Sequence, residues 1–463
     1  MVFSSSIFLF IFLPLIWLGH WLLPSLRGKN ILLSVASLLF YAFGEPIYVI
    51  LMVISVAVNY WAALRIGEGE TRRRWPMVFA VVFDLAMLGV FKYAGFAVEC
   101  INLLPLIELP VPAIRLPIGI SFFTFQILSY VVDVYRGDTQ VQRRADDLFL
   151  YISFFPQLIA GPIVKYHDIA EQITNRTVTA ELTARGLRRF LFGLSKKLLI
   201  SNPCGLLTDT AFAALGEGTL AAPLGWLGAV AYCFQIYYDF SGYSDMAIGL
   251  GQMFGFHLFE NFNYPYISGS IREFWRRWHI SLSTWFKEYL YIPLGGSRRG
   301  KARTVLNKYI VFFTTGLWHG ASLNFIVWGL FHGTMQMAEE IIRPTERRWL
   351  RPIWRVVTLA AICLSFVVFR ADNMADAAGY LAVLFGAGGA SASAALALLD
   401  PYTLTVLAVA ALFCLPIVPA LRRRADGNAA LDTVGYAITL PLFALCVMAL
   451  ASSTYNPFIY FRF

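Results

Sequence analysis

The sequence predicts an all-α protein that crosses a membrane many times. Apolar residues make up 58% of the 463 residues and charged residues only 14%, against about 25% charged in a typical soluble domain. A soluble core stops growing near ~250–300 residues, so it cannot bury this much apolar surface. Long apolar runs, separated by short basic loops, recur along the whole chain. We therefore expect one integral membrane domain over residues 1–463, with about 10–12 transmembrane helices.

Other protein classes do not fit this composition. The six cysteines contain no Cys-x-x-Cys pair and are too few for a secreted disulfide scaffold. The net charge of +9 comes mostly from Lys and Arg in short loops, so nucleic-acid binding is not expected. The chain has no Gly-rich phosphate loop, no HExxH motif, no GxSxG motif and no zinc-type Cys/His cluster. ATPase, metalloprotease and serine hydrolase functions, and a metal site, therefore have no support.

The apolar runs can be placed in order, because a membrane-crossing helix needs about 20 mostly apolar residues. The first run has no Lys or Arg before Arg27, unlike a signal peptide, so we expect it to be retained. Stretches near 147–163 and 186–212 contain prolines or a lysine pair, which predicts broken or re-entrant helices there. The clear candidate spans are roughly 3–24, 31–43, 47–64, 76–97, 116–134, 224–240, 305–325, 355–370, 402–420 and 432–452.

The loops between the spans predict the orientation. Arg72, Arg73 and Arg74 follow the third span, and similar basic clusters lie near residues 298–303 and 422–424. The loop 99–114 carries Glu but no Lys or Arg. Because basic loops stay in the cytoplasm, we expect both termini in the periplasm and the chain in a bacterial inner membrane.

The segment Ile271–Tyr291 carries the first candidate histidine. Its apolar and aromatic residues recur with helical spacing, and His279 falls on that stripe, with Arg, Lys and Glu mostly outside it. This pattern predicts one amphipathic helix. It fits a helix that lies at the lipid headgroups, and also a re-entrant helix that carries His279 into a wet cavity.

The run Tyr309–Ala338 carries two more histidines and no Asp, Glu, Lys or Arg. Ionisable side chains at membrane depth are costly and usually face the protein interior or water. His319 precedes Gly320 and Ala321, whose small size leaves room for a substrate. A functional role and a helix-packing role both remain open for His319, whereas packing is favoured for His332.

The segment Ile236–Gly249 contains two aspartates. Asp239 and Asp245 flank a Ser-Gly-Tyr-Ser sequence at the end of an apolar stretch. Such carboxylates bind a cation, orient a histidine or satisfy broken backbone. Structural support is the first interpretation.

Taken together, these motifs resemble those of the membrane-bound O-acyltransferases, in particular the bacterial branch that serves alginate O-acetylation and D-alanyl transfer to teichoic acids. The resemblance covers essentially the whole chain. The matching segments, in order, are the N-terminal MVFSS, Leu116–Phe122 (LPIGISF), Phe155–Ile163 (FPQLIAGPI), Asp239–Asp245 (DFSGYSD), Phe274–Ser281 (FWRRWHIS), Leu317–Gly320 (LWHG), Val368–Ala371 (VFRA) and Pro457–Phe463 (PFIYFRF).

The resemblance implies a fold and roles for both histidines. His319 corresponds to the catalytic histidine of the family and His279 to its second histidine. The implied fold is a ring of membrane helices around a thin centre, where a tunnel joins the two faces. With these histidines we expect Trp278, Trp318, Asp239 and Gln157 to bind substrate.

The implied chemistry is O-acetyl transfer to an exported, alginate-like polysaccharide. A neutral imidazole removes the proton of the attacking hydroxyl, and N–H donors stabilise the oxyanion. We expect acetyl-CoA as the donor on the basic cytoplasmic side, no bound cofactor, and a periplasmic acetyltransferase or the polymer as acceptor. The alternatives are D-alanyl or other acyl transfer, a secondary transporter and a scaffold subunit without chemistry.

Overall fold

The computed structural model describes residues 1–68, 72–105, 107–424, 429–452, 455–457 and 459. Every named element of these residues is a helix, and one isolated bridge pairs Ala221 with Gly389. The predicted all-α class is therefore confirmed.

Several helices are long and apolar enough to cross a bilayer. Large apolar side chains on them point outward, such as Val356, which is 68% exposed, and Leu440, which is 74% exposed. Such surfaces suit lipid rather than water, and the chain is a membrane protein. Within the described residues, five helices meet the length and hydropathy of a span: Val49–Ile66, Arg74–Ile101, Ala180–Gly216, Leu350–Arg370 and Asp432–Ser452. Three shorter apolar helices cover Phe8–Leu22, Met374–Ala387 and Pro401–Phe413.

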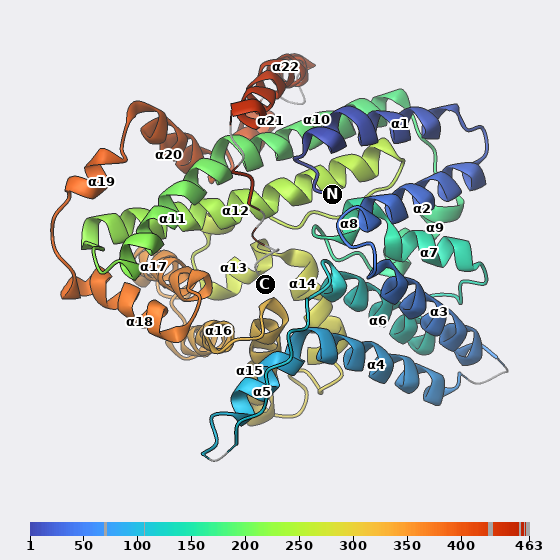
Figure 1. Ribbon diagram of the computed structural model, residues 1–463, viewed down its shortest axis with the longest axis horizontal. Coiled ribbons are helices and arrows are strands. Elements are labelled where there is room, and N and C mark those ends of the chain that lie inside the picture. Colours follow the sequence, from blue (N-terminus) through green and yellow to red (C-terminus); the bar gives the residue numbers. More distant parts are fainter. Residues whose placement is uncertain (69–71, 106, 425–428, 453–454, 458, 460–463) are drawn as a thin grey trace. The chain divides into compact units, whose positions relative to one another are not determined.

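The chain divides into two compact units, and the first contains residues 1–190 and 244–259. Its centre is a cluster of phenylalanine rings, with centroids of neighbouring rings about 5 to 6 Å apart; Phe8 and Phe12, for example, are 5.6 Å apart. Helices α3, α4 and α6 of this unit pack against one another (Figure 1). The elements of this unit are η1 (Phe8–Phe12), α1 (Leu13–Leu22), α2 (Leu26–Ala42), α3 (Val49–Ile66), α4 (Arg74–Leu88), η2 (Gly89–Tyr93), α5 (Ala94–Ile101), α6 (Ile120–Arg136), α7 (Ala145–Ser153), α8 (Phe155–Leu158) and α9 (Tyr166–Thr174).

The second unit contains residues 191–243 and 260–463. Two helices, α10 (Ala180–Ser195) and α12 (Ala222–Met253), begin in one unit and end in the other. The further elements of the second unit are η3 (Lys196–Ser201), α11 (Asn202–Gly216), η4 (Pro265–Ile267), α13 (Ile271–Arg277), α14 (Ile280–Phe286), η5 (Lys287–Tyr291), α15 (Lys301–His319), α16 (Leu323–Ile342), α17 (Leu350–Arg370), α18 (Met374–Ala382), η6 (Val383–Ala387), α19 (Ser393–Ala397), α20 (Pro401–Phe413), α21 (Ile417–Arg424) and α22 (Ala429–Ser452).

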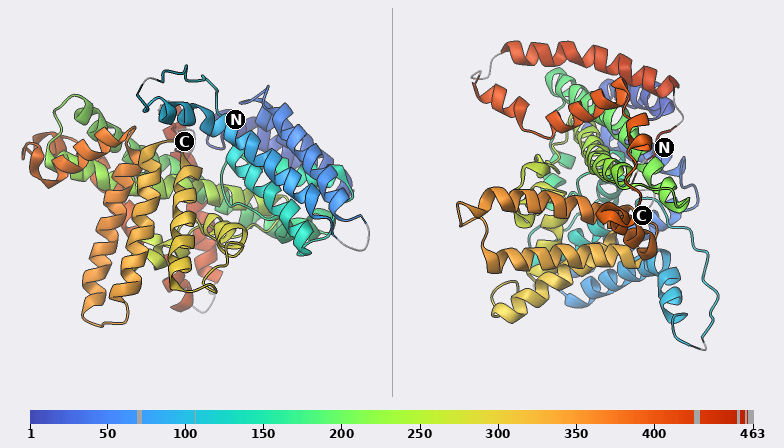
Figure 2. Two further views of the ribbon diagram at one scale, coloured as in Figure 1. Left: turned by 90° about the horizontal axis from the view of Figure 1, so that it is seen from below. Right: turned by 90° about the vertical axis from the view of Figure 1, so that its left-hand side faces the viewer.

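Glycines let α15 and α16 cross closely in the second unit (Figure 2). A Cβ atom on Gly316 would lie 2.3 Å from the carbonyl oxygen of Phe325, and one on Gly329 would lie 2.3 Å from that of Phe312. No side chain fits at these distances, so the two helix backbones touch. This contact fixes the end of α15, where His319 lies.

The structure differs from the sequence-based prediction of helix breaks at two places. The stretch 186–212 is not broken, because α10, η3 and α11 continue as one helix from Ala180 to Gly216. Pro203 lies just after the π-helical turn η3, where the regular α-helical hydrogen-bond pattern is already interrupted, and Lys197 forms a buried ion pair. Conversely, the charge-free run Tyr309–Ala338 breaks after His319, so His319 and His332 lie on different helices.

Candidate active site

His319 is the last residue of α15. Gly320 follows in an extended conformation, with φ −169°, and ends the helix. The imidazole is 6% exposed and has aromatic rings around it. Its centroid lies 4.9 Å from that of Trp318 and 5.2 Å from those of Trp328 and Phe369. The imidazole is therefore enclosed mainly by aromatic side chains.

A small cavity adjoins His319. Its volume is about 10 Å³, roughly the space that one water molecule needs. Its walls are mostly aromatic, and His319 is the ionisable residue among them. The lining residues are Ile236, Phe240, Trp278, His319, Trp328, Phe366, Phe369 and Ile459.

His279 lies at a break that the sequence pattern did not predict. The expected helix over Ile271–Tyr291 is split into α13, α14 and η5, with His279 between the first two. Its backbone is left-handed, with φ 43° and ψ 56°, a conformation that costs a residue with a side chain about 1–2 kcal/mol. The side chain is fully buried. The segment therefore turns inward at His279 and does not form one interfacial helix.

Asn261 holds this break together, and the sequence analysis missed it. Its side-chain oxygen lies 3.3 Å from Nδ1 of His279 and accepts hydrogen bonds from both the backbone N–H and the hydroxyl of Ser281. Its backbone carbonyl accepts a hydrogen bond from Ile280. Nε2 of His279 has no hydrogen-bond partner among the described residues. Asn261 thus fixes the ring through Nδ1, and Nε2 is the buried nitrogen without a hydrogen bond among the described residues.

The two histidines share an aromatic neighbour. The ring centroid of Trp318 lies 4.9 Å from that of His319 and 5.8 Å from that of His279. Trp278, the residue before His279, lines the His319 cavity and stacks on Phe274 at 5.4 Å. The structure therefore brings together four of the six predicted site residues: His279, His319, Trp278 and Trp318.

The other two predicted residues have different surroundings. Asp239 lies on α12 and forms a buried ion pair with Lys197, with a distance of 2.7 Å between Oδ1 and Nζ. Gln157 belongs to the first unit, where its amide donates a hydrogen bond to the carbonyl of Tyr151. Among the described residues, no group of three or more His, Cys, Asp or Glu side chains is arranged to hold a metal ion.

His332 has a packing role, as its position suggested. Nδ1 accepts a hydrogen bond from the indole N–H of Trp275, and Nε2 lies 3.2 Å from the hydroxyl of Ser365. Both ring nitrogens are therefore engaged in contacts between helices.

Trp328, a neighbour of His332, differs because its polar atom is unbonded. This residue is buried and lines the His319 cavity, and its indole N–H has no hydrogen-bond partner among the described residues.

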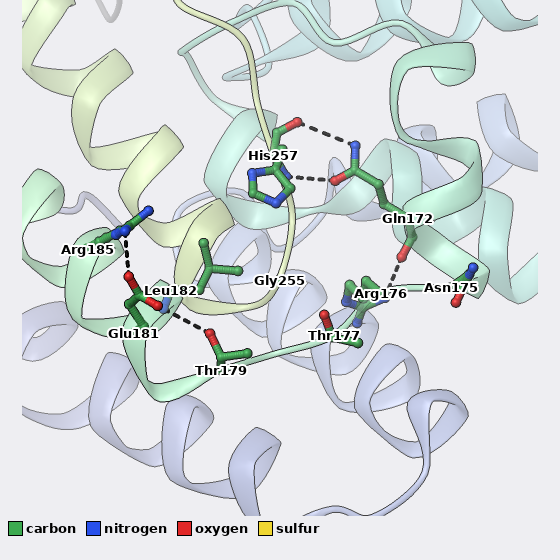
Figure 3. A pocket seen from close by; sticks show the side chains of 10 residues that line it. All are labelled: Gln172, Asn175, Arg176, Thr177, Thr179, Glu181, Leu182, Arg185, Gly255 and His257. Carbon is green, nitrogen blue, oxygen red and sulfur yellow. Dashed lines mark hydrogen bonds and ion pairs between the residues drawn. The ribbon is translucent and has the colours of Figure 1, made fainter.

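A separate pocket in the first unit does not have the features of a catalytic site (Figure 3). Its volume is about 320 Å³, but its charged and polar groups bind each other. Arg176 donates hydrogen bonds to the carbonyls of Gln172, Ile173 and Phe254. Arg185 is paired with Glu181, and Gln172 bonds the backbone of His257. The pocket is thus the joint where α9, α10 and the end of α12 meet.

His167 is a further histidine that the sequence analysis passed over. It lies in the first turn of α9, and its Nδ1 lies 2.9 Å from a carboxylate oxygen of Asp133 on α6. The hydrogen bond with Asp133, and a second one with Asp168, raise the pKa of His167 to about 10. Asp133 thus helps to join α6 and α9, a role that its position in the sequence did not indicate.

The sequence of this chain is similar to those of known proteins. Residues 145–374, which include both His279 and His319, match the membrane-bound O-acyltransferase family. The chain is 40% identical to a probable alginate O-acetylase of Pseudomonas putida over the full length of both. It is 35% identical to a peptidoglycan O-acetyltransferase of Helicobacter pylori, over 84% of this chain and 81% of that one.

A third relative is more distant. The chain is 25% identical to a teichoic acid D-alanyltransferase of Bacillus subtilis, over 54% of this chain and 68% of that one. All three relatives are named for acyl transfer, to alginate, to peptidoglycan and to teichoic acid respectively. The full-length match and the family match together establish the identity of this chain: it belongs to the membrane-bound O-acyltransferase family and is an O-acyltransferase.

Proposed function

We propose that this enzyme passes an acetyl group from a cytoplasmic donor across the inner membrane for O-acetylation of an exported, alginate-like polysaccharide. The observation that carries the proposal is the position of His319 at the end of α15, in the wall of a small, mostly aromatic cavity. The relatives matched over more than four fifths of their length are named for O-acetylation. The D-alanyltransferase matches only about half of this chain, so acetyl is the favoured acyl group.

In the proposed reaction His319 is the general base. A hydroxyl attacks the carbonyl carbon of the acetyl thioester while the neutral imidazole accepts the hydroxyl proton. The new C–O bond forms as the carbonyl becomes an oxyanion. When the intermediate collapses, the C–S bond breaks and His319 returns the proton to the leaving thiolate. The protein begins and ends the cycle with a neutral imidazole, which the apolar surroundings of His319 favour.

Trp328 is the proposed donor to the oxyanion. Its buried indole N–H faces a negative charge only when the intermediate forms, and it has no competing partner among the described residues. A donor held in a dry site strengthens as charge develops, because little water screens it. His279, with its available Nε2 and its fixed Nδ1, orients the substrate or carries a second proton.

The proposed donor is acetyl-CoA, which enters from the side that carries the basic loops. Lys and Arg in those loops suit a phosphate-bearing donor. The acetyl group leaves on the periplasmic side, to a partner acetyltransferase or to the polymer itself. Both termini are proposed to lie on that side.

Replacing His319 tests the proposal. We expect His319→Ala to lower polymer acetylation by at least about 10²-fold, and Trp328→Phe by about 10²–10³-fold, with membrane abundance near that of the wild type. The measurement is acetate ester per sugar of exported polymer, normalised to the amount of enzyme. His257→Ala is the matched control, because that residue is exposed and lies in the other unit. Wild-type acetylation by the His319 variant would rule out its role as the base.

A further inference from the structure

A short segment near the end of the chain forms part of the wall around His319. Ile459 is 7% exposed and lines the small cavity of His319. Ile459 also lines a second, larger cavity of about 430 Å³. Part of its lining is polar and includes Asp209, Gln235 and Arg370. The side chain of Ile459 therefore lies between the site of the proposed chemistry and a space large enough for a sugar-sized group.

Backbone contacts hold this segment in place. Asp239 accepts a hydrogen bond of 2.8 Å from the N–H of Ile459. Lys197 donates a hydrogen bond to the carbonyl of Pro457, and Lys197 and Asp239 are themselves paired. The pair thus binds one donor and one acceptor of the segment, two residues apart.

Two further contacts anchor the start of the segment. Asn202 donates a hydrogen bond of 3.1 Å to the carbonyl of Tyr455, and the hydroxyl of Tyr455 donates one of 2.6 Å to Asp209. Gly205 leaves room for this approach, since a Cβ atom there would lie 2.8 Å from the Tyr455 oxygen. The segment is therefore anchored at both ends, to the helix that contains η3 and α11 and to α12.

A buried ion pair is a costly way to stabilise a fold. The side chains of Lys197 and Asp239 are 4% and 1% exposed. Apolar side chains of similar volume often serve stability as well or better, because two charges must lose their water. Apolar side chains cannot, however, form hydrogen bonds with the N–H of Ile459 and the carbonyl of Pro457.

We propose that Lys197 and Asp239 are positioning residues for acyl transfer, which hold residues 455–457 and 459 so that Ile459 separates the His319 cavity from the larger polar cavity. The inference rests on the proposed role of His319 as the base. Without the pair, Ile459 moves from the wall, the two cavities join, and the substrate carbonyl is no longer held against the imidazole.

The test replaces the pair by apolar residues of similar size. We expect the double variant Lys197→Met, Asp239→Leu to keep or raise its melting temperature in detergent. Its acetylation of the polymer per folded molecule should fall at least about tenfold, because small misplacements in a site cost that much or more. Arg189→Met with Asp245→Leu is the matched control: this ion pair joins α10 to α12, as Lys197 and Asp239 join η3 to α12, but it lies in the first unit. We expect that control to acetylate normally.

A second variant keeps the test decisive if the pair variant does not fold. Ile459→Ala leaves the pair intact and should also lower acetylation at least about tenfold, whereas Ile459→Val should retain most of it. The triple variant combines the pair substitutions with Ile459→Ala. Because the pair acts through Ile459, its acetylation should be no lower than that of the less active of these two variants. The proposal would be overturned if the folded pair variant or Ile459→Ala acetylated the polymer like the wild type. It would also be overturned if the fold-loss of acetylation in the triple variant equalled the product of the two separate losses. An inactive His319→Ala beside an active pair variant would leave the proposed function intact.

Discussion

At the scale of single residues, the backbone of His279 shows how the site is shaped. The left-handed conformation turns the chain between α13 and α14 and directs the imidazole into the protein. Glycine adopts this conformation without strain, whereas any residue with a Cβ atom does not. The histidine is thus retained at a position where the backbone alone favours glycine, which is typical of a residue that serves function.

This strain can be measured by comparing two variants that both lack the imidazole. We expect His279→Gly to be more stable than His279→Ala by about 1 kcal/mol, because only glycine relieves the left-handed strain. Thermal unfolding of both proteins in the same detergent gives the comparison. Both variants should lose most acetylation. Equal melting temperatures would mean that the conformation at residue 279 carries no cost.

At the scale of elements, the crossing of α15 and α16 sets the position of His319. The crossing depends on Gly316 and Gly329, which lie against each other's helix. His319 lies less than one turn beyond Gly316, so any separation of the helices displaces the imidazole directly.

We expect Gly316→Ala and Gly329→Ala each to lower both the melting temperature and the acetylation of the polymer. Overpacking of this kind typically costs about 1–3 kcal/mol, since the added methyl group meets backbone atoms that cannot yield. Gly89→Ala is the control, because a Cβ atom there meets nothing within 4 Å. If both variants kept the melting temperature and the acetylation of the wild type, the close approach of α15 and α16 would not be needed for stability or activity.

The contact between α6 and α9 predicts a dependence of stability on pH. The pKa of His167 is raised to about 10, first by the hydrogen bond with Asp133, from about 6.5 in the unfolded chain. A raised pKa means that the contribution is fully present below about pH 6.5 and is lost as pH rises through about 10. The difference in melting temperature between wild type and His167→Gln should therefore be largest near pH 6 and shrink steadily toward pH 10. A difference that grows with pH would contradict this assignment.

At the scale of the whole molecule, the membrane orientation remains a prediction that thiol labelling checks. Cys100 is the exposed native cysteine, so Cys100→Ser provides the background. In spheroplasts, an impermeant thiol reagent should label Glu108→Cys, which lies in the loop proposed to be periplasmic. It should label Ser297→Cys only after the membrane is opened, because the basic loop near 298 is proposed to be cytoplasmic. The reverse pattern would place the donor on the other side.

The amino-acid pattern predicted the helical membrane class and the main histidines because both leave strong local signals. Apolar runs and a histidine in a charge-free segment can be read without knowing the fold. The break at His279 could not be predicted, because the segment keeps a helical period through it and the turn is fixed by Asn261, 18 residues away. Likewise, the partner of Asp239 lies 42 residues earlier and that of His167 lies 34 residues earlier.

The anchoring of Ile459 by Asp239 links the site to protein synthesis. The two residues are 220 positions apart, and a ribosome adds roughly 5–20 residues per second. The nascent chain therefore carries Lys197 and Asp239 for roughly 10–45 seconds before the segment that they bind is made. His319 is made during that interval, while the wall beside it still lacks Ile459, so the cavity beside His319 is completed only late in synthesis.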